Sequence, residues 1–308
     1  MIYTCTITPS LDYTTYLPSF ETGQLNRAED VYYYPGGKGI NVSRVLKRLH
    51  TDSIAIGYVG GFVGHYIETF LRDEAIETDF IEVDGITRIN VKIKAAKETE
   101  LNGPGPNITI RQQEVLQEKV KSMRAGDWFV LAGSLPASIP MSFFEQLAKV
   151  CEENEIHFVL DTSGPALKKL IHTKPFLVKP NLEELGELFD TKIETKEKAF
   201  EYAKKLIALG VTYVVVSMGG EGALLITENK FISARAPQGQ MVNTVGAGDS
   251  LVAGFIASYT QKADAVEAFR QGVASGSATA FRSDLCEGPD VLALIDHVKM
   301  IDETDVKR

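Results

Sequence analysis

Between residues 111 and 217 the chain alternates helical patterns with short apolar runs, and this alternation constrains the fold more than any other feature. Helical periodicity spans residues 111–123, 141–154, 182–188 and 196–209, and strand-like apolar runs span residues 128–132, 157–161, 176–179 and 213–217. Strands that are buried on both faces and separated by helices form parallel sheets, because a parallel pair needs a long crossover connection. We therefore predict an α/β fold with a doubly wound, mostly parallel sheet flanked by helices.

Length and composition limit the remaining possibilities. The 308 residues contain no linker-like or low-complexity stretch, and 44% hydrophobic with 24% charged residues is typical of a globular protein, so we expect a single domain over residues 1–308. No apolar run approaches the ~20 residues of a membrane span, and the start of the chain lacks the basic residues of a signal peptide. We therefore expect a cytoplasmic protein without a membrane partner. The net charge of −9 disfavours nucleic acid as a partner, and the scattered cysteines and histidines lack the spacing of a metal site.

A second, smaller sheet is predicted outside this core. Residues 13–35 show short aromatic and β-branched runs, and residues 88–94 alternate apolar and polar side chains. Together these regions can form a small sheet that lies over a cleft. The polar face of the second segment carries Arg88, Asn90, Lys92 and Lys94. A cationic face suits an anionic ligand in a chain this acidic, and a solvated strand face is an equal alternative.

The predicted core strands end in small or polar residues, one of them in Asp161. This is typical of a ligand-binding edge, because the carboxyl ends of parallel strands meet at one side of the sheet. The first strand, residues 2–7, is followed by turn residues that lead to Asp12. At the carboxyl end of that strand, Asp12 is a candidate acceptor of hydrogen bonds from substrate hydroxyls. An Asx-type turn explains it equally well.

A glycine turn at residues 36–39 leads into an amphipathic helical segment that ends near Leu49. Lys38 lies at the start of this helix, where acidic residues are favoured, and contact with a phosphate would explain the placement. The turn is not a P-loop, because the Gly-x-x-x-x-Gly-Lys-Ser/Thr spacing is absent. A second glycine-rich stretch, residues 57–64, lacks the middle glycine of a dinucleotide fingerprint, which disfavours a Rossmann dehydrogenase.

Residues 242–257 combine a predicted strand end, a glycine turn and an apolar helix. Gly246, Ala247 and Gly248 leave backbone N–H groups open, and the helix start adds unpaired donors and a positive dipole end, so this turn is a candidate anion site. Asp249 follows at its mouth, where a carboxylate can take the proton of a hydroxyl that attacks a phosphoryl group. The alternative is a tight turn with Asp249 as a helix N-cap, and the spacing by itself favours that alternative.

Asn181 and Glu184 lie one turn apart on the same face of a predicted helix. A carboxamide and a carboxylate so placed can hold a hydrated Mg²⁺, which takes few protein ligands and several waters. From these two residues alone, a helix cap followed by an acidic first turn is the stronger interpretation.

Taken together, these stretches resemble the ribokinase-like (pfkB) carbohydrate kinase family over nearly the whole chain. Residues 36–42 (GGKGINV) match the family's amino-terminal glycine signature, and residues 243–249 (NTVGAGD) match its carboxy-terminal signature, in the expected order. Residues 179–184 resemble the family's Asn-x-x-Glu motif, which is associated with Mg²⁺ and phosphate handling. Residues 217–223 resemble its nucleotide-binding strand and turn.

The resemblance implies a ribokinase-like fold with a β lid formed by about residues 13–35 and 88–110, and an enzyme that uses ATP and Mg²⁺. Asp249 would be the general base, and the amides of Gly246, Ala247 and Gly248 would stabilise charge on the γ-phosphoryl group. The implied sugar-phosphate residues are Asp12, Gly37, Lys38, Asn41, Arg88 and Asn90, the implied nucleotide residues are Lys179, Asn181, Ser217, Gly219 and Gly222, and Glu184 would hold Mg²⁺ through water.

Within the family, the glycine signature and residues 8–12, 87–92 and 133–136 are most similar to the branch that phosphorylates sugar phosphates. A phosphate on the acceptor calls for cations beyond those that serve ATP, and Lys38, Arg88, Arg27 and Lys92 can supply them. The expected reaction is ATP-dependent phosphorylation of D-fructose 1-phosphate to D-fructose 1,6-bisphosphate. Tagatose 6-phosphate is the alternative acceptor, and a non-catalytic sensor of sugar phosphate or nucleotide is the alternative on the same fold. The lid is also a candidate surface for a homodimer.

Overall fold

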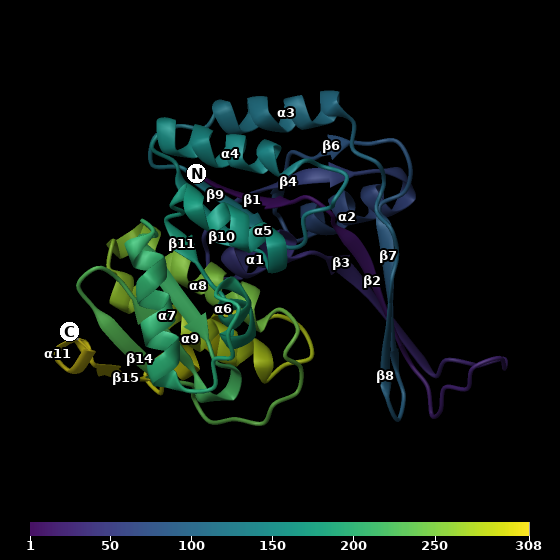
Figure 1. Ribbon diagram of the computed structural model, residues 1–308. Coiled ribbons are helices and arrows are strands. Elements are labelled where there is room, and N and C mark those ends of the chain that lie inside the picture. The colour runs from purple at the N-terminus through teal and green to yellow at the C-terminus, as the bar shows by residue number, and fades with distance from the viewer. Residues whose placement is uncertain (308) are drawn as a thin grey trace.

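The computed structural model describes the backbone of residues 1–307 and the side chains of residues 1–305, and its centre is one large twisted sheet (Figure 1). Over these residues the sheet has eleven strands in the order β15-β14-β13-β12-β11-β10-β9-β1-β4-β5, with β6 also paired to β4. The strands are β1 (Ile2–Thr6), β4 (Ile54–Val59), β5 (Glu77–Thr78), β6 (Ile81–Glu82), β9 (Trp128–Ala132), β10 (His157–Asp161), β11 (Leu177–Val178), β12 (Tyr213–Ser217), β13 (Ala223–Ile226), β14 (Phe231–Arg235) and β15 (Lys299–Asp302).

The strands from β12 to β5 run parallel, and β13, β14 and β15 run antiparallel at the other edge. Successive side chains of a strand point to opposite faces, and both sets are buried here. In β9, for example, Phe129 and Leu131 lie in one apolar core and Val130 lies in the core on the opposite face. This double burial explains the continuous apolar runs in the sequence. The predicted doubly wound, mostly parallel α/β fold is confirmed.

Helices cover both faces of the large sheet. The core that contains Phe129 is covered by α3 (Ile110–Lys121), α4 (Met141–Glu153), α5 (Gly164–Leu170), α6 (Leu182–Leu188) and α7 (Lys196–Ala208). The opposite core is covered by α1 (Lys38–Arg48), α8 (Ala247–Lys262), α9 (Ala265–Ala280) and α10 (Gly288–Ile295), and α2 (Gly61–Asp73) packs on β4. The 3₁₀ turns η1 (Ile171–Thr173) and η2 (Gly219–Glu221) and the terminal helix α11 (Thr304–Lys307) are short. Over the described residues, none of the helices combines the length and the apolar character needed to cross a membrane.

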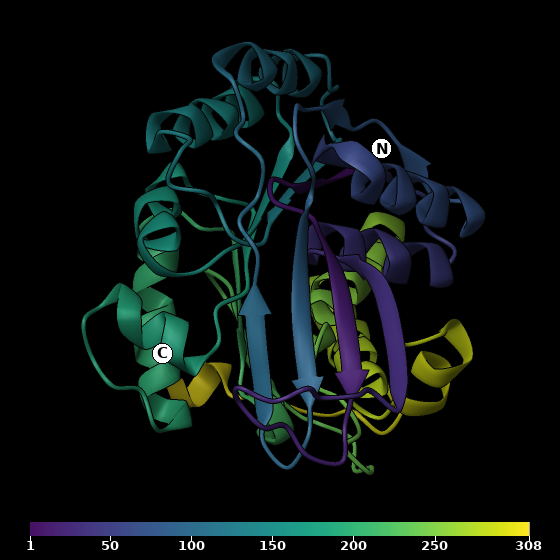
Figure 2. The same cartoon turned by 90° about the vertical axis from the view of Figure 1, so that its right-hand side faces the viewer.

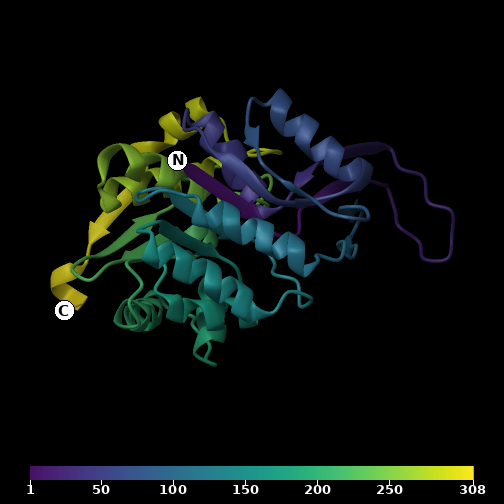
Figure 3. The ribbon, with the colours of Figure 1, turned by 90° about the horizontal axis from the view of Figure 1, so that it is seen from above.

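A separate sheet of four strands stands out from this body in the described structure, in the order β3-β2-β7-β8. Its strands are β2 (Ser10–Tyr16), β3 (Asp30–Gly36), β7 (Arg88–Lys94) and β8 (Glu98–Asn102). Figure 2 looks onto this sheet, and Figure 3 shows the connection between β2 and β3 projecting from the body. The expected small sheet is therefore present.

The position predicted for Asp12 was wrong in one respect. Strand β2 begins at Ser10, so Asp12 lies inside the small sheet and not at the carboxyl end of β1. Backbone pairing of β2 with both β3 and β7 satisfies the polar groups of the whole segment, and this outweighs the local turn preference of the sequence around Pro9.

The strand end predicted at Val242 was also wrong. Among the described residues, 241–245 form a loop, in which the N–H groups of Val242 and Asn243 donate to the carbonyl of Ala280 at 2.8 and 3.2 Å. A contact with the end of α9 thus replaces the strand pairing that the β-branched residues suggested. Helix α8 then begins at Ala247, as expected from the apolar run that follows.

Candidate active site

A polar cavity of about 400 Å³ lies between the small sheet and the carboxyl ends of β1, β9 and β11. Residues of the two glycine signatures meet in it, although Asn41 and Asp249 are 208 positions apart in the chain. Of the predicted site residues, those that line this polar cavity are Asp12, Gly37, Lys38, Asn41, Arg88, Asn90, Lys179, Asn181, Glu184, Gly246, Gly248 and Asp249.

The glycine turn of Gly246, Ala247 and Gly248, here called the anion turn, begins α8 beside this cavity. Gly246 has a φ of 80°, a conformation that glycine adopts without strain, and a Cβ atom there would lie 2.5 Å from Leu285. A Cβ atom on Gly248 would lie 3.0 Å from Nζ of Lys179. The two glycines therefore allow close approach from both sides. The N–H of Ala247 donates to the carbonyl of Thr244 at 3.2 Å. Because the first N–H groups of an α-helix lack partners within the helix, the anion turn still offers its other donors and a positive dipole end to the cavity.

Asp249 is the third residue of α8 and is almost completely buried, at 6% exposure. Its Oδ2 accepts a hydrogen bond of 2.8 Å from Nδ2 of Asn41. In the described structure the N-cap position of α8 is Gly246, with no side-chain capping bond, so the interpretation of Asp249 as an N-cap was wrong. Burial and the negative charge of Asp161 raise the pKa of Asp249 to about 6, against the lowering effects of Lys38, Asn41 and Lys179. The carboxylate is therefore ionised at neutral pH and unusually basic.

Two lysines meet at a buried aspartate next to Asp249. Nζ of Lys38, at the start of α1, lies 3.0 Å from Oδ1 of Asp161, and Nζ of Lys179, after β11, lies 3.6 Å from the same oxygen. The structure places Lys179 on the polar cavity, whereas the resemblance assigned it to the nucleotide. From the sequence, Asp161 is predicted only to be a polar strand end, because the apolar residues before it do not indicate which side chains it will contact.

Asp12 and Arg88 come to the cavity from the small sheet. Oδ1 of Asp12 accepts hydrogen bonds from Ser10 (2.7 Å) and Asn90 (3.0 Å), and Oδ2 accepts one from Lys92 (3.2 Å). Arg88 is half-buried, and its Nε is shielded from solvent with no hydrogen-bond partner among the described atoms, as is Oδ1 of Asn90. Burial lowers the pKa of the Arg88 guanidinium. A buried donor without a partner is energetically unfavourable, so Arg88 favours an anionic ligand at this point of the cavity.

A larger groove of about 960 Å³ adjoins the polar cavity on the other side of the anion turn. The predicted nucleotide residues Asn181, Ser217, Gly219 and Gly222 line it, and so do Ala247 and Gly248 of the anion turn. Its apolar walls include Met241, Val273 and Phe281. The sequence pattern does not predict them as site residues, because Met241 lies in a loop, Val273 on the buried face of α9, and Phe281 directly after that helix. Gly248 lines both spaces, so the groove and the polar cavity meet at the anion turn.

Asn181 and Glu184 form a reciprocal capping box at the start of α6. Oδ1 of Asn181 accepts the Glu184 N–H at 2.8 Å, and Oε2 of Glu184 accepts the Asn181 N–H at 2.9 Å. The capping interpretation is therefore confirmed. The same two side chains also line the polar cavity, and the second carboxylate oxygen of Glu184 takes no part in the cap.

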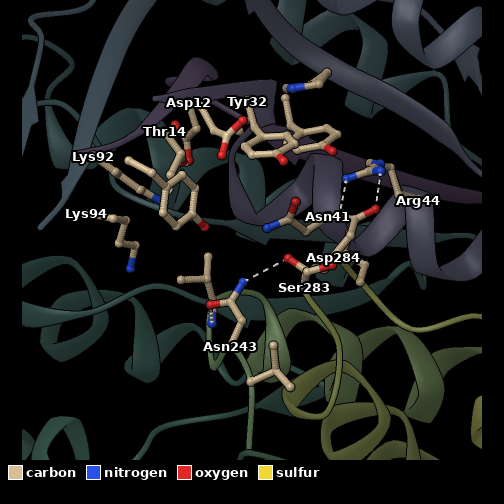
Figure 4. A pocket seen from close by; sticks show the side chains of 18 residues that line it. Asp12, Thr14, Tyr32, Asn41, Arg44, Lys92, Lys94, Asn243, Ser283 and Asp284 are labelled. Atoms are coloured by element: carbon tan, nitrogen blue, oxygen red, sulfur yellow. Dashed lines mark hydrogen bonds and ion pairs between the residues drawn. The ribbon is translucent and has the colours of Figure 1, made fainter. Parts of the chain in front are cut away.

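The polar cavity continues outward into a third space of about 450 Å³ along the small sheet (Figure 4). Asp12, Thr14, Tyr32, Lys92 and Lys94 face it from the small sheet, and Asn41, Arg44, Asn243, Ser283 and Asp284 face it from the body (Figure 4). Arg44 is buried and forms ion pairs with Glu74 and Asp284 at 2.8 and 3.0 Å, which fixes the wall of this outer cavity. Of the cations expected for a substrate phosphate, Lys92 faces this space, while Arg27 is exposed on the β2–β3 connection.

Comparison with known proteins places these features in a family. The sequence profile of the pfkB family carbohydrate kinases matches residues 7–290 of this chain. The 1-phosphofructokinase of Bacillus subtilis (strain 168) is 51% identical over 300 residues, which are 97% of this chain and 99% of that protein. The D-tagatose-1-phosphate kinase of Bacillus licheniformis is 36% identical over 286 residues, which are 92% of this chain and 94% of that protein.

Solved structures show the same likeness. Two structures of phosphofructokinase-2 from Escherichia coli, one in complex with fructose-6-phosphate and one of the tetrameric inhibited form, each match this chain with a TM-score of 0.90. The sequence identity is 30%, and each alignment covers 96% of this chain and 98% of the other. At this coverage the likeness includes the small sheet as well as the large one.

Proposed function

Because the chain belongs to the pfkB family of carbohydrate kinases, we propose that it transfers the γ-phosphoryl group of ATP to D-fructose 1-phosphate, which yields D-fructose 1,6-bisphosphate and ADP. The observation that carries the proposal is the meeting of two spaces at one buried carboxylate. Gly248 lines both the polar cavity and the groove, and Asp249 follows it directly. An acceptor in the cavity and a nucleotide in the groove would have the γ-phosphoryl group between them, at the anion turn.

The charges of the polar cavity support an acceptor that already carries a phosphate. Arg88 brings a buried Nε without a partner, and Lys38 brings an ammonium group whose side chain is about one-third exposed, at 34%. A phosphate would give Arg88 the hydrogen-bond partner that it lacks and would bring a second anion to Lys38, which already pairs with Asp161, whereas a free sugar would bring no negative charge to either group. The name of the Bacillus subtilis relative agrees with fructose 1-phosphate as this acceptor.

In the proposed reaction Asp249 takes the proton of the acceptor hydroxyl. The new oxygen–phosphorus bond forms while the bond between the γ-phosphorus and the bridging oxygen breaks, and ADP leaves with that oxygen. The hydrogen bond from Asn41 orients one oxygen of the carboxylate and leaves the other for the incoming hydroxyl. Amides of the anion turn, together with Lys38 and Lys179, stabilise the charge on the transferred group.

The residues at the junction fit a hydrated Mg²⁺. Among the side chains that the structure describes, no group of three or more His, Cys, Asp or Glu could hold an ion. Glu184 offers one carboxylate oxygen beside the carboxamide of Asn181, and this suits Mg²⁺, which keeps several waters and takes further ligands from nucleotide phosphates. Glu184 would hold the ion through water. When bound, Mg²⁺ neutralises charge on the phosphate oxygens.

A coupled ADP-release assay with ATP and Mg²⁺ tests the proposal. The acceptors are fructose 1-phosphate, tagatose 1-phosphate, tagatose 6-phosphate, fructose 6-phosphate, free fructose and ribose. Fructose 1-phosphate is expected to give the highest kcat/KM and to exceed both free sugars by at least ~10²-fold, the scale of two charge-assisted hydrogen bonds. Equal efficiency with free fructose or ribose would reject a phosphorylated acceptor.

Two other results would replace the proposal by an alternative. Tagatose 1-phosphate is the second candidate acceptor, because the Bacillus licheniformis relative carries that name and the two sugars differ only in configuration at C4. A higher kcat/KM for tagatose 1-phosphate or tagatose 6-phosphate would reassign the acceptor. Binding of sugar phosphate and ATP without turnover of any acceptor would instead support a sensor on the same fold.

We expect this activity in the cytoplasm, where ATP and sugar phosphates are available. The three cysteines support a reducing compartment, because Cys5, Cys151 and Cys286 are all buried free thiols. The net charge of −9 makes nucleic acid an unfavourable partner. The proposed partners are therefore the sugar phosphate and ATP.

The outer face of the small sheet supports a homodimer as well. Tyr33, Tyr13, Val91 and Leu101 lie directly opposite one another across the four strands, so they form one apolar row on one face. On the same face of the small sheet, Leu11 and Ile89 pack against the apolar cluster that includes α2. Farther along the strands that cover is missing, and the side chains of Tyr33 and Leu101 are 53% and 58% exposed. A second copy of the same face would cover this row symmetrically.

Light scattering coupled to size exclusion tests this arrangement. The wild-type chain is expected to have the mass of two copies, and the double variant Tyr33→Asp/Leu101→Asp the mass of one. The control is Leu292→Asp, because Leu292 is equally apolar and 73% exposed on α10, away from the small sheet. A dimer that survives the double variant would place the contact elsewhere, and a single-copy wild type would reject the homodimer.

A further inference from the structure

The most completely buried charge near the anion turn is a carboxylate that the proposed reaction does not use. Asp161 ends β10 with its side chain at 0% exposure. Its Oδ1 lies 3.0 Å from Nζ of Lys38 and 3.6 Å from Nζ of Lys179. Its Oδ2 is buried without a hydrogen-bond partner in the described structure. One carboxylate thus serves two ammonium groups, while half of its own hydrogen-bonding capacity is unused.

Fold stability does not explain such an arrangement. Burying a carboxylate is unfavourable, and a buried ion pair is often no more stabilising than apolar side chains of the same volume. The partners also come from separate elements, since Lys38 begins α1 and Lys179 follows β11. Both lysines line the polar cavity, and Nζ of Lys179 lies close to Gly248 of the anion turn. The site of the ion pairs therefore points to a role in the active site.

We propose that Asp161 is a positioning residue that holds the ammonium groups of Lys38 and Lys179 together beside the anion turn, where they stabilise the phosphoryl group in transfer. The inference rests on the phosphotransfer proposed above and deepens it. Asp161 itself does not touch the reacting atoms. Without its charge, two ammonium groups of like sign would separate, and neither would be held at the required distance.

The electrostatic surroundings agree with this role. Although burial by itself raises the pKa of Asp161, the ammonium groups of Lys179 and Lys38 outweigh it and lower that pKa. Burial lowers the pKa of Lys38, but the carboxylates of Asp161 and Asp249 raise it above its ordinary value. Asp161 therefore favours the charged form of Lys38. Its negative charge also raises the pKa of Asp249, so the same residue makes the proposed base more basic.

The charged groups around Asp249 come from several elements at the polar cavity. They are Lys38 on α1, Asp161 at the end of β10, Lys179 after β11, Glu184 on α6, and Asp12 and Arg88 on the small sheet. Of the three carboxylates in this group, Asp161, Glu184 and Asp12, it is Asp161 whose negative charge most raises the pKa of Asp249. Neutralising Asp161 is therefore expected to make Asp249 easier to ionise.

The test uses Asp161→Asn, which keeps the shape of the side chain and removes its charge. kcat with fructose 1-phosphate is expected to fall about 10- to 100-fold, the scale of one or two charge-assisted hydrogen bonds. KM for the sugar phosphate is expected to rise less than in Lys38→Ala, because the lysine is still present. The acidic limb of the kcat–pH profile is expected to move to lower pH. An unchanged limb together with a small loss of kcat would reduce Asp161 to a structural role.

A second readout does not depend on activity. Mass spectrometry measures the rate at which the Lys38 amine is acetylated by a water-soluble acetylating reagent. In Asp161→Asn the rate is expected to rise, because loss of the carboxylate lowers the pKa of Lys38 and frees the neutral amine. Unchanged reactivity of Lys38 in a folded Asp161→Asn variant would overturn the proposal. If the wild type phosphorylates no sugar phosphate, the proposed function fails, and this readout still decides whether Asp161 holds Lys38.

Two further variants guard against a general effect of buried charge. Asp127→Asn is the matched control, because Asp127 is buried at the opposite end of the sheet and pairs with the terminal amine of Met1 at 2.5 Å. Asp127→Asn is expected to change neither the pH profile of kcat nor the reactivity of Lys38.

If Asp161→Asn does not fold, the variant Lys179→Met provides a second test. In this variant Lys38 is the remaining ammonium group that pairs with Asp161, so acetylation of Lys38 is expected to slow and kcat to fall. Faster acetylation in that variant would contradict the proposal.

Discussion

Replacing Asp249 by asparagine is expected to lower kcat and, at the same time, to stabilise the folded protein at neutral pH. Asparagine keeps the shape of the side chain and can still accept the hydrogen bond from Asn41. It cannot take the proton of an attacking hydroxyl. Loss of a general base reduces the rate by about 10²- to 10⁴-fold. KM for both substrates is expected to change little, because neither phosphate is held by this side chain.

The gain in stability follows from the pKa of Asp249, which is about 6 in the folded protein against an ordinary value of 3.8. The folded state binds this proton more tightly than the unfolded state, so raising the pH from about 4 to about 6 favours unfolding through this group. The difference corresponds to about 3 kcal/mol, since each pKa unit is worth about 1.4 kcal/mol. Asp249→Asn removes the charge and is expected to raise the free energy of unfolding by up to about 3 kcal/mol at pH 8. At pH 4 the gain should largely disappear.

The measurements are kcat from the coupled assay and the free energy of unfolding from urea titrations at several pH values between about 4 and 8. Asp127→Asn is the control of opposite sign. Burial raises the pKa of Asp127, but its bond to the terminal amine and the Arg124 N–H lower that pKa overall, so its loss is expected to destabilise the protein near neutral pH. A folded Asp249→Asn enzyme with more than about a tenth of wild-type kcat would refute the general-base role. Destabilisation at pH 8 would refute the electrostatic argument.

Three other outcomes follow from the same site. Lys38→Ala should raise KM for the sugar phosphate far more than KM for ATP. The control Lys47→Ala, on the same helix but paired with Asp52, should change neither KM. An effect confined to the KM for ATP would assign Lys38 to the nucleotide in the groove and not to the sugar phosphate in the polar cavity. Hydrogen exchange in the small sheet and its connections should slow when sugar phosphate and a non-hydrolysable ATP analogue bind, because a phosphoryl group in transfer must be shielded from water, and unchanged exchange would make the sheet a rigid scaffold. Gly246→Ala should lower kcat more than Gly126→Ala. Both glycines have a φ near 80°, but only at position 246 would an added Cβ atom collide with a neighbouring side chain. Equal kcat values for the two variants would show that the anion turn tolerates displacement.

Much of the fold could be predicted from local patterns. The strands at residues 128–132, 157–161 and 213–217 and the helix at residues 182–188 occur with the predicted bounds. These elements are short, strongly apolar and bounded by polar residues, so local preference and burial favour the same backbone. The predictions were wrong where the two disagreed. At Val242 β-branched residues favoured a strand, but hydrogen bonds to the end of α9 hold the chain in a loop.

The sequence also predicts the residue types of the candidate site, because the glycine turn and Asp249 are adjacent in the chain. The contacts among them were not. Asn41 meets Asp249 across 208 positions, and Lys38 meets Asp161 across 123 positions. No local pattern predicts such pairs. The local spacing around Asp249 therefore favours an N-cap, whereas in the folded chain its side chain contacts Asn41.

Sequence patterns describe which backbone a segment adopts and which face it buries, since both depend on neighbours within a few positions. The order of strands in the sheet depends instead on how whole layers pack. That order brings the ends of β10 and β11 together with the start of α1, and it puts Lys38 and Lys179 on one carboxylate of Asp161. The raised pKa of Asp249 is a property of this assembly, because burial and the charge of Asp161 act on it only once distant segments have excluded water from the site.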